Sequence, residues 1–162
     1  MLQDKLKEIK VVLFDYDDTL CIHDNFLTER RSSEEWWDSC FRDDGEWYTD
    51  EYQCKASKQM DRFALDIQKL RIPMHVLTWS NTNMHEFARK RFLQINYEAN
   101  FDRIFIVGER HVKVRLAEQL CRYMGITRHE LLLVDDHPTT REEFVDAGFQ
   151  VTSPSSVMIW YQ

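Results

Sequence analysis

The sequence has 162 residues, of which 43% are hydrophobic, 13% aromatic and 30% charged. This length suits one domain with its own core, and the aromatic content excludes a disordered chain. The net charge of −7 repels phosphate backbones, so we expect no non-specific binding of nucleic acid.

The apolar residues predict no targeting or membrane segment. The N-terminal stretch MLQDKLKEIK alternates charged and apolar residues, unlike a signal peptide, and no stretch reaches the roughly 20 apolar residues that span a bilayer. The four cysteines form no C-x-x-C pair, which argues against a zinc site and a disulfide framework. We therefore expect reduced thiols and a cytoplasmic protein that does not associate with membranes.

Apolar runs of strand length alternate with helical patterns along the chain. The predicted strands cover residues 11–15, 74–78, 102–108, 131–136 and 149–153. Continuous apolar runs such as VVLFD are typical of strands that are buried on both faces of a parallel sheet.

The predicted helices lie between these strands, at residues 57–71, 80–93, 112–124 and 138–148. In the second helix, Asn81 or Thr82 is the expected cap, and Met84, Phe87 and Ala88 are expected to face the core. The alternation predicts an α/β fold: a doubly wound, Rossmann-like parallel sheet of about five strands with helices on both faces. Ligands of such sheets bind beyond the carboxyl ends of the strands.

Residues 21–57 interrupt this alternation and are rich in charge and tryptophan. Within them, Ser32 and Glu35 fit a capping box for a short helix. Fewer than about 40 residues bury too little surface to fold alone. We therefore expect a single domain over residues 1–162, with 21–57 as a flap or small lid whose apolar wall includes Trp36, Trp37 and Trp47.

Acidic residues gather where two of the predicted strands end. Asp15 and Asp17 follow the first strand, and Asp135 and Asp136 end the fourth. Parallel strands would bring these groups to one edge of the sheet, where their mutual repulsion favours a bound cation. Mg²⁺ prefers such hard oxygen ligands, and Asp136 would complete the site that Asp15 and Asp17 begin. With a lysine nearby, the site would also accept a phosphoryl group.

The motif DYDDTL, residues 15–20, resembles the D-x-D-x-T-L signature of the haloacid dehalogenase (HAD) superfamily, most of whose members are Mg²⁺-dependent phosphohydrolases. Thr78 after an apolar strand, Lys113 at the start of a helix and the acidic pair in LLLVDDHP follow in that superfamily's order. The similarity covers about residues 10–152 outside the 21–57 insert. The acidic pair resembles that of the small, cap-poor magnesium-dependent phosphatases.

This resemblance implies a HAD-like hydrolase domain with a role for each motif residue. Asp15 would be the nucleophile that becomes an aspartyl phosphate, and Asp17 would be the general acid and then the general base. Thr78 and Lys113 would bind the phosphoryl group. Mg²⁺ would be held by the side chains of Asp15 and Asp136 and the backbone carbonyl of Asp17, with Asp135, Ser80 and Asn81 in supporting roles.

Some assignments stay open at this point. Asp135 and Asp136 could exchange roles, and Ser80 competes with Thr78. Asp18 stands where many relatives have glycine, and we expect it to be a solvated loop residue.

The sequence therefore predicts a Mg²⁺-dependent phosphomonoester hydrolase that acts on a phosphorylated small molecule or macromolecule. The alternatives are a phosphoacceptor signalling domain on a similar sheet and a binding protein that has lost turnover. Receiver domains place their lysine on the last strand, whereas Lys113 precedes the final acidic pair. The substrate candidates are protein phosphoresidues, nucleotides, polynucleotide 3′-phosphates and sugar phosphates, and the sequence leaves the oligomeric state open.

Overall fold

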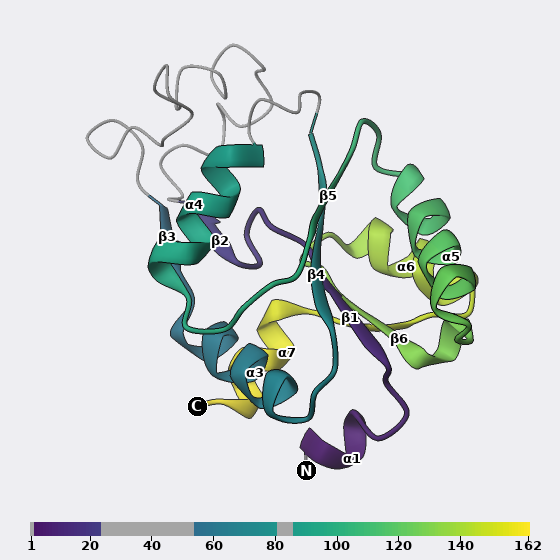
Figure 1. The fold of residues 1–162 in the computed structure, drawn as a ribbon, viewed down its shortest axis with the longest axis horizontal. Helices are drawn as coiled ribbons and strands as arrows, with labels where there is room; N and C mark the ends of the chain where they lie inside the picture. The colour runs from purple at the N-terminus through teal and green to yellow at the C-terminus, as the bar shows by residue number, and fades with distance from the viewer. Residues whose placement is uncertain (1, 24–53, 81–85) are drawn as a thin grey trace.

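The computed structural model describes residues 2–23, 54–80 and 86–162 (Figure 1). Its centre is a five-stranded sheet in the order β5-β4-β1-β6-β7, in which every neighbouring pair is parallel. The strands are β1 (Val11–Phe14), β4 (Met74–Trp79), β5 (Ile104–Val107), β6 (Leu131–Val134) and β7 (Gln150–Thr152). The predicted doubly wound sheet is confirmed.

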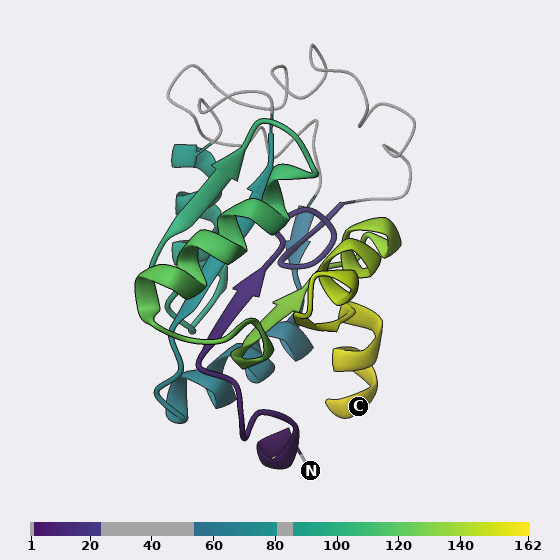
Figure 2. The same cartoon turned by 90° about the vertical axis from the view of Figure 1, so that its right-hand side faces the viewer.

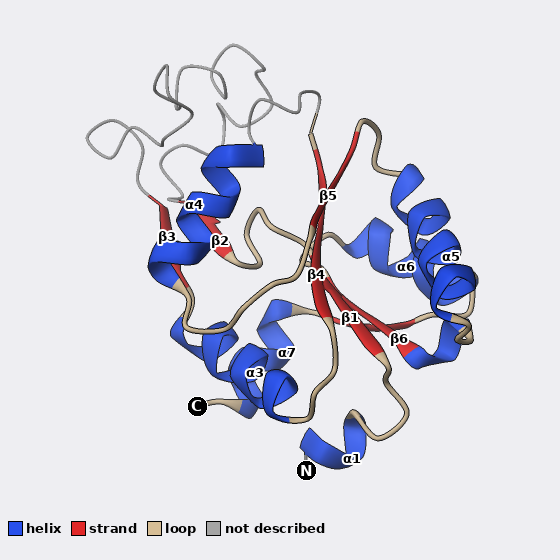
Figure 3. Ribbon diagram, in the orientation of Figure 1, coloured by secondary structure: helices blue, strands red, loops and turns tan. Residues whose placement is uncertain are grey.

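Helices cover both faces of this sheet (Figure 3). One face carries α3 (Lys58–Lys69), α4 (Glu86–Asn96) and α7 (Pro154–Trp160), and the other carries α5 (Val112–Met124) and α6 (Pro138–Asp146). Figure 2 shows the second face, with α5 in front of the strands. The short helix α1 (Leu2–Lys5) precedes β1, and a 3-10 turn (Arg128–Glu130) precedes β6.

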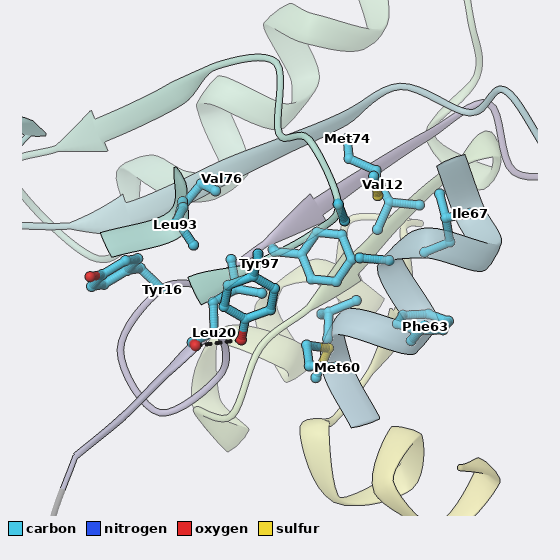
Figure 4. Packing of buried hydrophobic residues seen from close by; sticks show 14 of the residues in the cluster. Val12, Tyr16, Leu20, Met60, Phe63, Ile67, Met74, Val76, Leu93 and Tyr97 are labelled. Atoms are coloured by element: carbon cyan, nitrogen blue, oxygen red, sulfur yellow. Dashed lines mark hydrogen bonds between the residues drawn. The ribbon is translucent and has the colours of Figure 1, made fainter. Parts of the chain in front are cut away.

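Successive residues of β1 enter different cores, because side chains alternate along a strand. Val12 and Phe14 belong to the core under α3, α4 and α7, whereas Val11 and Leu13 belong to the core under α5 and α6. Figure 4 shows the first of these cores, where Tyr97 donates a hydrogen bond of 2.5 Å to the carbonyl of Leu20. Burial on both faces explains why the strand is a continuous apolar run.

The order of the strands places a topological switch between β1 and β6. From β1 the chain moves outward to β4 and β5, then returns to the other side of β1 as β6 and continues to β7. Phe14 at the end of β1 is in register with Val134 at the end of β6. The residues that follow these two strands therefore emerge side by side at the carboxyl edge, where such sheets bind ligands.

The two ends of the predicted insert form a small antiparallel pair. Strand β2 (Cys21–His23) pairs with β3 (Cys54–Ala56), so that Cys21 lies opposite Ala56. Residues 24–53, with Ser32, Glu35 and the three tryptophans, lie outside the described residues. The lid and the single-domain boundaries stay predictions.

The second predicted helix differs in its inward face. Helix α4 is described from Glu86 to Asn96, and the expected caps Asn81 and Thr82, with Met84, lie outside the described residues. Ala88 is buried as expected, but Phe87 is 56% exposed, so its placement in the core was wrong. The buried stripe contains Ala88, Arg89, Phe92 and Leu93, and Phe87 lies about 100° away from Ala88 around the helix axis.

Across the ranges that the structure describes, no helix has the length and apolar character needed to cross a bilayer.

Candidate functional site

Side chains from β1, α5 and the end of β6 meet at the carboxyl edge of the sheet. The Lys113 Nζ atom lies 2.9 Å from Asp15 Oδ1 and 3.0 Å from Asp135 Oδ2. Lys113 is only 5% exposed, so these contacts are shielded from solvent. One buried ammonium group thus joins Asp15 and Asp135, which lie 98 residues before and 22 residues after Lys113 in the chain.

The alternation of side chains explains this convergence. Leu13 and Leu133 face the core under α5. Asp15 and Asp135 each come two residues later, so their side chains point to the same side of the sheet. On α5 the fully buried stripe consists of Lys113, Ala117 and Cys121, at the four-residue spacing of a helix face. Lys113 is therefore the first inward residue of its helix and not a surface lysine.

The backbone after β1 holds Asp15 in place. The Asp15 amide donates to the carbonyl of Val134 at 2.8 Å, and the Thr19 hydroxyl lies 3.5 Å from Asp15 Oδ2. Asp18 has a φ of 59°, in the left-handed region that favours glycine and that aspartate tolerates better than most residues. Asp18 is half-buried and turns the chain, so our expectation of a solvated loop residue was incomplete.

Three carboxylates form one acidic cluster. Ligand oxygens of Asp15, Asp135 and Asp136 all lie within 4.8 Å of one another. Burial raises the pKa of Asp15 to about 7 against the lowering effect of Lys113, with Asp136 and Asp17 raising it further. Burial and the charge of Asp15 raise the pKa of Asp135 to about 6. Burial also raises the pKa of Asp136.

This cluster fits a divalent cation. It gathers more negative charge than Lys113 neutralises, and a cation between the oxygens would favour the ionised carboxylates. Burial alone would lower the pKa of Lys113, but Asp15 and Asp135 raise it above its ordinary value, so the lysine stays charged. The donor set is made of hard oxygens, which Mg²⁺ prefers.

Asp135 and Asp136 have different surroundings. Asp135 is fully buried, and its two oxygens accept hydrogen bonds from Lys113 Nζ and from the His137 amide, the latter at 2.8 Å. Asp136 is exposed. This geometry favours Asp136 as the direct metal ligand and Asp135 as the residue that holds Lys113.

Thr78 lies on β4, next to β1 in the sheet. It is buried, and its hydroxyl has no hydrogen-bond partner among the described residues. A buried hydroxyl without a partner costs about 1–3 kcal/mol, and a phosphoryl oxygen would satisfy it. Ser80 is half-buried beyond the end of β4, where its amide donates to Val107 at 2.9 Å. Asn81 lies outside the described residues.

Asp17 lies on the other side of the loop, against helix α4. Its carboxylate is 28% exposed, and Oδ2 lies 3.7 Å from Nη2 of the buried Arg89. The sequence analysis gave Arg89 no role. The signal was nevertheless present, because a charged residue occupies a position between Ala88 and Phe92, in the inward stripe of the helix.

Comparisons with known proteins identify the fold. No family model matches the chain, and no curated protein matches it by sequence. An uncharacterized protein from Listeria monocytogenes matches 90% of this chain and 78% of its own, with a TM-score of 0.58 and 14% identity.

Two further structural neighbours were solved with a bound metal ion. A HAD family enzyme from Bacteroides thetaiotaomicron, solved with magnesium and inorganic phosphate, matches 90% of this chain and 93% of its own, with a TM-score of 0.56 and 11% identity. The cobalt-bound deoxy-D-mannose-octulosonate 8-phosphate phosphatase from Haemophilus influenzae matches 92% of this chain and 70% of its own, with a TM-score of 0.52 and 14% identity. The chain therefore has the fold of HAD family hydrolases.

Proposed function

We propose that this chain is a Mg²⁺-dependent phosphomonoester hydrolase of the HAD superfamily that acts through an aspartyl phosphate. The observation that carries the proposal is the buried contact of Lys113 with Asp15 and Asp135 beside Asp136. A nucleophilic carboxylate, a fixed cation and a set of oxygen ligands are the parts that phosphoryl transfer needs. The fold shared with an enzyme solved with magnesium and phosphate supports the same assignment.

In the first step, a carboxylate oxygen of Asp15 forms a bond to phosphorus as the bond from phosphorus to the leaving oxygen breaks. Asp17 gives its proton to that leaving oxygen. In the second step, water attacks phosphorus and gives a proton to Asp17, while the bond between Asp15 and phosphorus breaks. Inorganic phosphate leaves, and both aspartates return to their starting states.

Lys113 and Thr78 bind the phosphoryl oxygens in both steps. Lys113 is rigid and charged because two buried carboxylates hold it, and the Thr78 hydroxyl is positioned by β4. Mg²⁺ would be held by the side chains of Asp15 and Asp136 and the carbonyl of Asp17, and when bound it neutralises phosphoryl charge.

Hydrolysis of a generic aryl phosphate, with and without Mg²⁺, tests this proposal. We expect turnover that requires Mg²⁺ and a loss of at least about 1,000-fold in kcat for Asp15→Asn, because the amide is no nucleophile. Asp146→Asn, an exposed aspartate on α6, is the matched control and should keep full activity. No turnover by the wild-type protein with Mg²⁺, or full activity of Asp15→Asn, would contradict the proposal.

A further inference from the structure

Helix α4 brings a buried positive charge against Asp17. The Arg89 side chain is 2% exposed, and its Nη2 atom lies 3.7 Å from Asp17 Oδ2. The guanidinium carbon lies 5.2 Å from the centroid of the Tyr16 ring. Tyr16 is itself buried and packs edge-on against Phe92 at 6.0 Å. Arg89 is therefore enclosed between its own helix and the residue that separates Asp15 from Asp17.

Packing alone does not account for this arginine. The Nε and Nη1 atoms of Arg89 are buried and have no hydrogen-bond partner in the ranges that the structure describes. Removing a guanidinium from water costs several kcal/mol, and an apolar side chain of similar volume commonly serves a core as well or better. A cation at such a buried position points to a role that needs its charge and shape.

The two partners differ in how firmly they are held. Arg89 belongs to a stripe with Ala88, Phe92 and Leu93, all of which are buried in the core, so its backbone is fixed. The backbone of Asp17 forms an isolated bridge with Cys21, but its carboxylate is 28% exposed. A partly exposed aspartate has several accessible rotamers, and a rigid charge on one side of it selects among them.

We propose that Arg89 is a positioning residue that holds the Asp17 carboxyl group where it exchanges a proton with the leaving oxygen. This inference rests on the proposed function. Arg89 takes part in no bond making or breaking. It reduces the number of orientations that Asp17 samples when the substrate is bound, and proton transfer needs hydrogen-bond reach.

A comparison of two substrates tests this role. An aryl phosphate with an acidic phenol as its leaving group departs without a proton, whereas an alkyl phosphate must be protonated as it leaves. kcat/KM covers the steps up to departure of the leaving group and excludes hydrolysis of the aspartyl phosphate. For Arg89→Met we expect kcat/KM to fall by about 10- to 100-fold with the alkyl phosphate and by less than about threefold with the aryl phosphate.

Asp17→Asn should show the same selectivity for the alkyl phosphate. In the Asp17→Asn background, Arg89→Met should add little further loss, because the residue that it positions is already absent. Equal losses with both substrates, or full additivity in the double variant, would overturn the inference and assign Arg89 a structural role.

Controls separate this inference from the proposed function and from misfolding. Lys90→Met, on the exposed face of the same helix, should leave both values of kcat/KM unchanged. If Arg89→Met does not fold, Arg89→Lys answers the same question: it keeps the charge without the planar fork, so the loss should be smaller but still selective for the alkyl phosphate. A wild-type protein that hydrolyses neither substrate would defeat the proposed function, whereas a non-selective Arg89→Lys would defeat this inference alone.

Discussion

Asp135 and Asp136 are neighbours in the chain, but their carboxylates have different surroundings: Asp135 is buried and Asp136 is exposed. Side chains alternate in direction where β6 ends, so Asp135 follows Leu133 toward α5 and Asp136 does not. Asp135 is occupied by Lys113 and by the His137 amide. Asp135 thus contacts the Lys113 ammonium group, whereas Asp136 has an exposed carboxylate near Asp15.

Replacing each residue by asparagine should separate these roles. Asp136→Asn should raise the Mg²⁺ concentration for half-maximal activity by at least about 10-fold, because it removes a charged ligand. Asp135→Asn should lower kcat while changing that concentration less, since Lys113 loses one of its two carboxylate partners. Titration of activity with Mg²⁺ measures both effects, and the reverse pattern would show that the two aspartates have exchanged roles.

Most of the candidate site follows from the sequence, and the exception has a physical reason. Asp15 and Asp135 were predicted to meet because parallel strands end at one edge, and Lys113 was expected beside them from its place in the HAD motif order. The structure brings all three into contact. The contact between Asp17 and Arg89 depends on the rotation of α4 about its axis and on its distance from the loop after β1. Neither quantity is encoded in a local pattern, so the sequence could show a charged residue in an inward stripe of the helix but not its contact with Asp17.

Helix α5 carries Lys113 near its first residue and ends at a glycine, Gly125, whose backbone is in the left-handed conformation. Gly125 has φ 67° and ψ 34°, the left-handed conformation that commonly ends helices, and a Cβ atom there would meet nothing within 4 Å. The cost of a side chain at this position is therefore conformational and not steric.

Gly125→Ala should lower the free energy of unfolding by about 1 kcal/mol, because alanine is strained in the left-handed region. Lys113 lies at the opposite end of the helix, so kcat/KM should stay unchanged. Unfolding in urea measures the stability. Gly108→Ala is the matched control, since Gly108 also has open space around it but no left-handed φ, and an equal loss there would contradict the argument.

At the level of elements, the sequence predicts which strands and helices are present better than it predicts which face of a helix is buried. All five predicted strands and the helices between them are present, because long apolar runs and helical spacing are strong signals. Phe87 was misplaced because its helix has apolar residues on more than one side, and packing against the sheet decides which of them is buried. The β2–β3 pair and α7 were not predicted, since each strand of the pair has three residues and α7 has seven.

The whole molecule carries a stability cost at the acidic cluster when no metal is bound. The pKa of Asp15 is raised to about 7 and that of Asp135 to about 6, so the folded protein keeps protons that the unfolded chain loses above its ordinary carboxylate pKa. The contribution of these groups to the free energy of unfolding therefore falls as pH rises from about 4 to about 7. Burial lowers the pKa of His75, which has the opposite effect on stability as pH falls below the ordinary histidine pKa.

Mg²⁺ should remove this cost, and it should do so more strongly at higher pH. Protons compete with the metal for the carboxylates, so the increase in Tm on adding Mg²⁺ should be larger at about pH 7.5 than at about pH 5.5. Stabilisation of about 2.7 kcal/mol is expected when Mg²⁺ is present at about 100 times its Kd. Thermal unfolding with Mg²⁺ and with a chelator, at the same pH, measures the increase in Tm. The contribution of His75 is the same in both samples and cancels. An increase that does not depend on pH, or one that persists in Asp136→Asn, would contradict this prediction.

The antiparallel pair of β2 and β3 has a consequence for how the molecule can vary. Cys21 lies opposite Ala56 and His23 opposite Cys54, so the two points to which residues 24–53 are attached are adjacent. The distance between these attachment points is set by strand pairing and not by the number of residues that connect them. We therefore expect that segments of other lengths and compositions can join β2 to β3 without a change in the geometry of the central sheet.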